Sequence, residues 1–459
     1  MLVFKTNKQG SLQLYQLWRP SEAIAIGQKM LDMFLCPQYR VEFDRLCKAS
    51  HNKLEQRINT ILNKKVKMNQ VADELDSLVD AMDTYLGYAL IHDPLQSYCD
   101  HLLSNHLSDP STVIALMTPA EDTFSMEILR HLYDCAIAYE TKSGKLNSLL
   151  QEHSDKFHWK RNSAFNTTRI TAEDVLKEVK EHGSKHYNNL IESADKSKLA
   201  LLQQKSEVIS KLPAFYRNVV DITDVYGPIF TDARKRLTTL ACAAFDKLLH
   251  VVAQSMPYPI EDLRYLVPQE LRHFIANPTG YKQRFVKRKK LFVLVQTDFP
   301  MIDEIIETTD KIMPMNEPFI AEGENAVKAL KKLNERLNFF VDENDNNLQT
   351  KTLKGTVAYK DKDEITGTVR IILNPTKETV KDGEILVAPT TTPNYLESMG
   401  KCLAIITDFG GQTSHAAIVS RELRKPCIIN TGIASHVLEN GQKIRMNFVD
   451  GTIEVMVIE

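Results

Sequence analysis

The stretch that decides the fold is residues 408–423, DFGGQTSHAAIVSREL, which places two glycines directly before a short helical pattern. The apolar run at residues 403–406 comes before it and predicts a buried strand. Thr413 or Ser414 can cap a helix that begins at this point. His415 is therefore expected in the first turn of a helix that follows a strand and a glycine turn.

The first turn of a helix favours an anion. Its unpaired backbone N–H groups and the positive end of the helix dipole attract negative charge, and neighbouring hydroxyls can donate hydrogen bonds to it. The same field lowers the pKa of an imidazolium, so the neutral, nucleophilic form of His415 should dominate near pH 7. A phosphorylated imidazole would be held well here. A histidine that only caps or packs also fits these features, and they do not decide between the two.

Short β-branched runs surround this helix and predict a compact α/β unit. Nine of the 17 glycines lie beyond residue 340, in about the last quarter of the chain, where they separate these runs. The expected strands are residues 368–373, 385–388, 403–406, 427–429 and 452–458. We assign this unit to residues 350–459.

The earlier part of the chain has a helical period instead. Apolar residues recur at helical spacing in residues 54–62, 71–86, 199–212 and 233–252. The polar stretch DENDNN at residues 342–347 has nothing to bury and suits a linker. We therefore predict a multidomain chain, mostly α-helical at its N-terminal side. Its helical part divides into an unassigned domain at residues 1–205 and a second segment at residues 206–341.

The ordered motifs of the α/β unit resemble the phosphohistidine swivelling domain of the phosphoenolpyruvate-utilising enzymes, as in phosphoenolpyruvate synthase-like and rifampicin phosphotransferase-like proteins. The resemblance spans residues 355–455 and rests on GTVR (367–370), DGEILVAP (382–389), TSHAAIV (413–419), REL (421–423) and LENGQ (438–442). It implies that His415 is the phosphorylated catalytic residue and that Thr413 and Ser414 contact the phosphate. It also implies that Gly410 and Gly411 form the turn that exposes the histidine.

In that family an ATP-grasp domain phosphorylates the histidine, and a second site passes the phosphoryl group to an acceptor. Residues 1–340 contain no glycine-rich nucleotide loop, and their helical period does not suit an ATP-grasp fold. Residues 234–274, and especially 260–271, are similar to the helical segment that precedes the carrier domain in phosphoenolpyruvate synthase-like chains. The resemblance thus predicts a split phosphotransferase, in which a separate ATP-grasp protein binds ATP and Mg²⁺ and the acceptor is an unidentified small molecule.

Two other functions fit the same residues. In one, His415 accepts a phosphoryl group for regulation, and the output is binding rather than synthesis. In the other, the α/β unit is a docking module of a non-catalytic helical adaptor. The intact Thr-Ser-His core at residues 413–415 argues against the adaptor, whereas the sequence does not separate the regulatory phosphocarrier from the split enzyme.

Composition limits the partners. Lys plus Arg number 57 and Asp plus Glu number 59, so no net field favours nucleic acid or a membrane surface. The seven cysteines form no CxxC pair, and no His cluster has metal-ligand spacing, so we expect reduced thiols and no metal site. Without a signal peptide or a membrane-spanning run, we expect a cytoplasmic protein. We interpret the basic run at residues 287–290 and the pair His182 and His186 as solvated.

Overall fold

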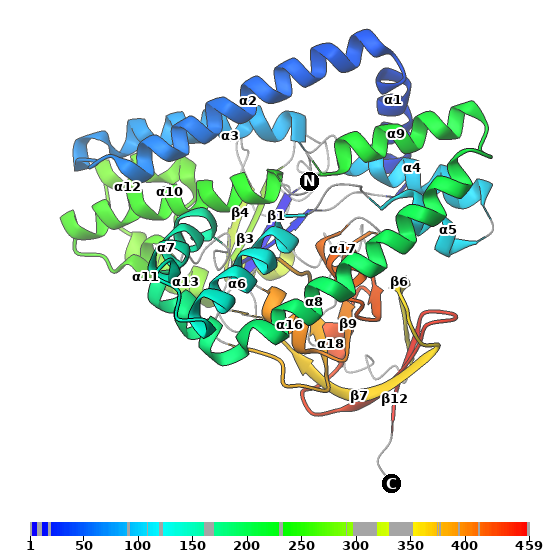
Figure 1. The fold of residues 1–459 in the computed structure, drawn as a ribbon. Coiled ribbons are helices and arrows are strands. Elements are labelled where there is room, and N and C mark those ends of the chain that lie inside the picture. Colours follow the sequence, from blue (N-terminus) through cyan, green and yellow to red (C-terminus); the bar gives the residue numbers. More distant parts are fainter. Residues whose placement is uncertain are drawn as a thin grey trace.

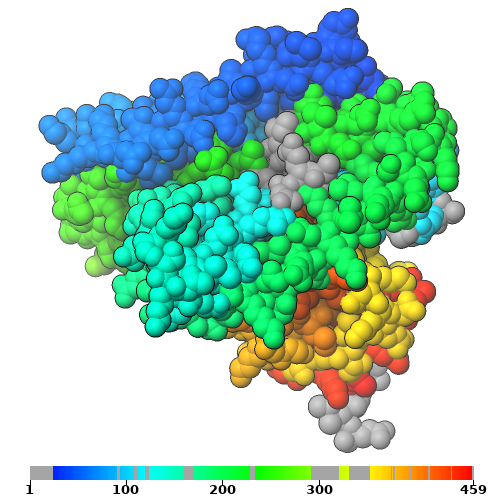
Figure 2. All heavy atoms as spheres, in the orientation of Figure 1, coloured from blue at the N-terminus to red at the C-terminus, as the bar shows by residue number. Residues whose placement is uncertain are grey.

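A layer of helices lies across a C-terminal α/β domain in the computed structural model of the chain (Figure 1). The structure describes residues 2–6, 12–16, 20–89, 92–107, 109–118, 123–159, 169–228, 233–290, 292–296, 319–329, 352–373, 375, 378–392, 395–411 and 414–456. The predicted fold class, a mainly helical region followed by an α/β region, is confirmed. In the space-filling view the yellow to red atoms of the C-terminal domain lie directly against the green and cyan atoms of the helical region (Figure 2).

The helical region is an assembly of helices, several of which pack against more than one other helix. They are α1 (Pro20–Phe34), α2 (Pro37–Asn63), η1 (Met68–Gln70), α3 (Val71–Ala89), α4 (His92–His106), α5 (Pro110–Leu116), α6 (Phe124–Glu140), α7 (Leu146–Phe157), α8 (Ala172–Ile209), α9 (Ala214–Pro228), α10 (Arg234–Ser255), α11 (Ile260–Leu263), α12 (Pro268–Ala276) and α13 (Tyr281–Lys290). The most extensive helix contacts join α6 to α8, α1 to α4, and α2 to α3. Within the described part of the chain, no helix is long and apolar enough to cross a membrane.

The helical periods predicted for residues 54–62 and 71–86 are confirmed by burial, whereas Leu199, at the start of the period predicted for residues 199–212, is 59% exposed. Leu54, Ile58 and Ile61 lie on one face of α2 and are fully buried, and Leu75 and Leu78 of α3 are 2% exposed. These faces meet each other and α10. Each buried aliphatic side chain contributes roughly 1.5–3 kcal/mol relative to its exposed state, so this stripe stabilises the pairing of the helices.

A small antiparallel sheet, not expected from the sequence, joins the N-terminus to the end of the helical region. Its strands are β1 (Leu2–Thr6), β2 (Leu12–Gln16), β3 (Phe292–Gln296) and β4 (Phe319–Glu322), in the order β2-β1-β3-β4. The backbone of Phe4 pairs with Leu14 on one side and with Leu294 on the other. The first strands of the chain therefore close onto a segment almost three hundred residues later.

The C-terminal domain is an eight-stranded mixed sheet. Its strands are β5 (Thr352–Lys354), β6 (Thr356–Tyr359), β7 (Glu364–Ile371), β8 (Glu384–Ala388), β9 (Ala404–Thr407), β10 (Cys427–Ile429), β11 (Lys443–Asn447) and β12 (Thr452–Val455), in the order β5-β12-β11-β7-β8-β9-β10-β6. Strands β7 to β10 run parallel at the centre, and the remaining pairings are antiparallel. The helices α16 (Leu396–Lys401), α17 (His415–Glu422) and α18 (Ala434–Val437) complete the domain.

The two faces of this sheet enter different cores. Along β8, Ile385 and Val387 join a core within the domain, whereas Leu386 and Ala388 join the core that continues into the helical region. This follows from the two-residue period of a strand. Helix α17 belongs to the second core and contacts α8 as well as β6, β9 and β10. Helix α17 therefore lies between the sheet and the helices of the helical region.

All five strands expected from the sequence are present, with ends that differ by a few residues, and the expected helix at residues 414–423 is α17. Strands β5, β6 and β11 were not expected, because they are short or alternate with charged residues. The predicted linker at residues 342–347 lies outside the described residues. The boundary predicted between residues 205 and 206 falls inside α8.

The interpretation of residues 287–290 as a solvated basic run is wrong for Arg288. Its side chain is fully buried and donates hydrogen bonds to both carboxylate oxygens of Glu270, at 2.6 and 2.8 Å. It also donates to Glu322 at 2.7 Å and to the carbonyl oxygen of Tyr265 at 2.6 Å. This guanidinium fixes α13 to α12 and to β4, because one planar group satisfies acceptors on all three sides.

Replacing Arg288 by methionine should lower the free energy of unfolding by roughly 3–5 kcal/mol, because the Glu270 and Glu322 carboxylates lose their buried partner. The exposed neighbour Lys287 is the matched control, and Lys287→Met should change stability by less than about 0.5 kcal/mol. Urea denaturation followed by circular dichroism measures both. Equal stabilities of the two variants would contradict this role for Arg288.

Candidate functional site

The turn between β9 and α17 is shaped by a close approach that only glycine permits. Gly410 has φ of 138°, and a Cβ at this position would lie 2.8 Å from Oγ of Ser414. Ser414 is the N-cap of α17, and its Oγ accepts a hydrogen bond of 3.3 Å from the backbone N–H of Ala417. A Cβ at Gly411 would meet no atom of the described residues within 4 Å, and Thr413 lies outside those residues.

Asp408 anchors the start of this turn. Its buried carboxylate accepts hydrogen bonds from the backbone N–H and the hydroxyl of Ser435 and from the hydroxyl of Thr431. Burial raises the pKa of Asp408 to about 6, although these hydrogen bonds oppose the rise. The carboxylate thus ties the end of β9 to the start of α18 and holds the base of the glycine turn.

His415 is held in a neutral, oriented state. Its Nδ1 lies 2.8 Å from Oγ1 of Thr391, which follows β8, and the residue is only 4% exposed. Burial lowers the pKa of His415 well below its ordinary value, and the positive charge of Lys235 lowers it further. The Nε2 atom is buried without a hydrogen-bond partner among the residues that the structure describes. Nε2 is therefore not engaged by any described residue, and a reaction partner could reach it once the ring is uncovered.

The helical region covers the His415 ring. Phe124, the first residue of α6, stacks over the imidazole with ring centroids 6.1 Å apart and an angle of 16° between the planes. Its neighbour Thr123 donates a hydrogen bond of 2.7 Å to Glu422 at the other end of α17. We expected the glycine turn to expose His415, but in this arrangement α6 lies over the ring and buries it.

A buried arginine lies behind the same helix. Arg421 of α17 is 4% exposed and donates from Nε to the carbonyl oxygen of Ala358 on β6, at 3.3 Å. Burial lowers its pKa to about 10, against the opposing charge of Asp100 on α4. The pKa of the Asp100 carboxyl is raised by burial, and the positive charge of Arg421 opposes only part of this rise. The contact between α17 and the helical region thus combines apolar packing with opposite charges.

Several residues of this site were missed in the sequence, although one signal was present. Strands β8 and β9 are parallel neighbours, so the residue that follows β8 lies at the same edge as the turn after β9. This rule places Thr391 near His415. No local pattern predicts that Phe124, Thr123 or Asp100 belongs to the site, because all three are about 300 residues from α17 in the sequence.

The other histidines singled out in the sequence do not join this site. His182 and His186 stack on each other on α8 with ring centroids 4.8 Å apart, and burial lowers the pKa of His186. His182 also lies near Glu181 and Glu397, and both of these carboxylates pair with Lys401. The structure brings together a further group that the sequence analysis did not recognise, consisting of His131, Cys135 and His153.

The comparisons with known proteins concern the domain that carries His415. Residues 380–451 match the family described as "PEP-utilising enzyme, mobile domain". A probable phosphoenolpyruvate synthase of Staphylothermus marinus is 42% identical over 96 residues, which are 20% of this chain and 12% of that protein. The phosphoenolpyruvate synthase of Pyrococcus furiosus is 45% identical over 87 residues, or 19% of this chain and 10% of that protein. The match thus spans about a tenth of the length of these curated relatives.

The crystal structure of aconitase X of Thermococcus kodakaraensis is also similar in part. The two chains are 18% identical, and the match covers 23% of this chain and 98% of the aconitase X chain, with a TM-score of 0.19. A score this low supports no argument about fold or function.

The burial of Asp408 predicts a pH dependence of stability that an Asp408→Asn variant should lack. The folded-state pKa of about 6 lies above the ordinary value of 3.8, so between these values the folded protein binds a proton that the unfolded chain releases. The contribution of this group to stability therefore falls as pH rises through this window.

The free energy of unfolding of Asp408→Asn, relative to the wild type, should accordingly improve by on the order of 3 kcal/mol between pH 4 and pH 7. Denaturant titration at both pH values measures this difference. A difference that is constant, or that moves in the opposite direction, would show that the Asp408 carboxyl is not held as described.

Proposed function

We propose that His415 carries a phosphoryl group on Nε2 and relays it from a donor protein to an acceptor. The observation that carries the proposal is the state of this ring, which is neutral and lies at the start of a capped helix. Its Nδ1 is engaged by Thr391, and its Nε2 has no hydrogen-bond partner among the described residues. The similarity of residues 380–451 to the mobile domain of PEP-utilising enzymes supports a phosphotransfer role. The phosphoenolpyruvate synthase relatives support the same class of reaction.

The proposed chemistry is nucleophilic attack by the imidazole. If Nδ1 carries the ring proton and donates it to Oγ1 of Thr391, the lone pair lies on Nε2. Nε2 then forms a bond to phosphorus, while the bond from phosphorus to the leaving oxygen breaks and its electron pair departs with the leaving group. The proton stays on Nδ1, where the ring charge offsets that of the phosphoryl group. Ser414 and the proposed contact Thr413, with Gly410 and Gly411, would lie beside that group at the positive end of α17.

The donor site in this proposal belongs to a separate ATP-grasp protein that binds ATP and Mg²⁺. The family model matches residues 380–451, within the C-terminal domain, and residues 1–340 contain no glycine-rich nucleotide loop. Because Phe124 lies over His415, the C-terminal domain must leave α6 before a donor can reach Nε2. The helical region would then serve the other end of the relay, where an unidentified small molecule accepts the phosphoryl group.

One observation favours a second function, a regulatory phosphocarrier. A phosphoryl group on Nε2 would place added charge in a buried space beneath Phe124, where water cannot solvate it. Phosphorylation would then oppose the docked arrangement, and the released helical surface could bind a different partner. Transfer to a small molecule separates the two functions, because a purely regulatory carrier does not require it.

Incubation of the chain with an ATP-grasp partner and labelled ATP should label His415. His415→Ala should abolish the label, and Thr391→Val should slow labelling roughly tenfold or more, because Nδ1 loses the group that orients the ring. His182→Ala, a histidine of α8 outside this site, is the matched control and should be labelled like the wild type. Separate labels on the β- and γ-phosphates identify the transferred group. Label that survives His415→Ala would overturn the proposal.

Removing the ring of Phe124 should make His415 easier to phosphorylate. Phe124→Ala deletes the stacking that holds α17 against α6, so the open arrangement becomes more populated and the labelling rate should rise about tenfold. The control is Ile137→Ala on the exposed side of the same helix, which should leave the rate unchanged. An unchanged rate for Phe124→Ala would mean that undocking does not limit access to His415.

A further inference from the structure

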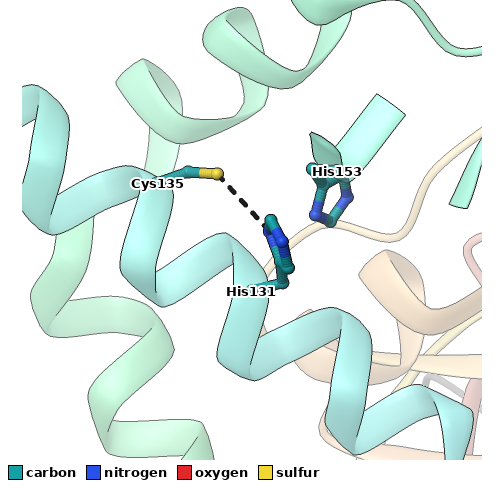
Figure 3. A group of neighbouring side chains, drawn as sticks. All are labelled: His131, Cys135 and His153. Carbon is teal, nitrogen blue, oxygen red and sulfur yellow. Dashed lines mark hydrogen bonds between the residues drawn. The ribbon is translucent and has the colours of Figure 1, made fainter. Parts of the chain in front are cut away.

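Three metal-ligating side chains converge where α6 packs against α7. His131 and Cys135 are four residues apart and share one face of α6, and His153 reaches them from α7. The Sγ of Cys135 lies 3.8 Å from Nδ1 of His131, and one ligand atom from each of the three residues lies within 4.8 Å of the other two. Figure 3 shows His131 between the other two side chains.

The group lies inside the protein. Cys135 and His153 are fully buried, and the side chain of His131 is 14% exposed. The two imidazole rings lie 5.2 Å apart between centroids, and both contact Phe157. Packing accounts for the apolar surroundings. It does not require that donor atoms from three residues on two helices meet at one point.

A carboxylate lies behind the histidine of this group. The Nε2 of His131 is 3.6 Å from a carboxylate oxygen of Glu152, which directly precedes His153 in the sequence. Since Nδ1 of His131 faces Cys135, Nε2 is the nitrogen turned towards Glu152. A carboxylate behind a ligating imidazole fixes the orientation of the ring and raises its basicity, and such pairs recur around protein metal sites.

We propose that His131, Cys135 and His153 bind Zn²⁺. Bonds of about 2.0–2.3 Å in a tetrahedral site place the ligand atoms roughly 3.5 Å apart, so separations of up to 4.8 Å need to shorten by at most about 1.3 Å. One thiolate and two imidazoles suit zinc better than the oxygen-preferring Mg²⁺ or Ca²⁺. Cys135 binds as the thiolate and releases its proton to solvent, and water takes the fourth position.

The site would stabilise the surface on which the C-terminal domain docks. Helix α6 begins at Phe124, which covers His415, and Trp159 beyond the end of α7 packs against Phe124 with centroids 5.4 Å apart. Zinc bound between α6 and α7 would fix these two helices to each other. The proposal does not depend on phosphotransfer, because it concerns only the helical region.

The test is zinc binding by the whole 459-residue chain after any bound metal has been removed with a chelator. Competition with a chromophoric chelator should give one Zn²⁺ per chain, and Co²⁺ in its place should give a thiolate-to-cobalt charge-transfer band. Cys135→Ser should lose the band and the bound metal. Glu152→Gln should keep the metal with about 10- to 100-fold weaker affinity. Added zinc should also raise the melting temperature of the wild type.

The controls are residues of the same kind elsewhere in the helical region. Cys99→Ser removes another buried helix cysteine and His182→Gln removes another helix histidine, and both should bind zinc like the wild type. If Cys135→Ser does not fold, His131→Gln at the less buried position gives the same readout. A wild-type chain that binds no stoichiometric zinc, or metal that survives both Cys135→Ser and His131→Gln, would overturn the proposal.

Discussion

The contact between α17 and the start of α6 is the constraint on which the rest of the structure depends. It places the imidazole of His415 beneath the ring of Phe124 and joins the two parts of the chain through the hydrogen bond between Thr123 and Glu422. The sheet below α17 is buried on both faces, so this helix is enclosed on two sides. An imidazole in such a place is stable only in its neutral form, because burial penalises the cation.

This constraint gives the proposed relay two arrangements with different chemistry. In the docked arrangement the ring is neutral, oriented by Thr391 and shielded from water. A phosphoryl group adds charge that the same surroundings cannot solvate, so the modified ring favours separation from α6. The opposite charges of Arg421 and Asp100 lie at the same contact and lose their mutual attraction on separation. The two arrangements therefore differ by several modest interactions, which suits the domain movement that the proposed relay requires.

The parts of the fold that depend on neighbouring residues could be predicted from the sequence. The central strands, the helix that begins at His415 and the buried stripes of α2 and α3 follow from local period and from Gly and Ser at the turn. What could not be predicted depends on residues that meet only after folding. Thr123 and Glu422 are 299 positions apart, and Arg288 is buried because α12 and β4 supply acceptors for it. Likewise, the spacing of His131 and Cys135 was visible, but His153 completes their group from the next helix.

Hydrogen exchange at the backbone of α17 and of the first turns of α6, compared between the phosphorylated and unmodified chain, tests the central claim most directly. If a neutral, buried His415 is the phosphoryl carrier, phosphorylation should speed exchange in both segments together, because they protect each other in the docked arrangement. Exchange elsewhere in the helical region, such as along α2 and α3, should stay unchanged. Protection that is retained at both segments while His415 carries the phosphoryl group would contradict the account.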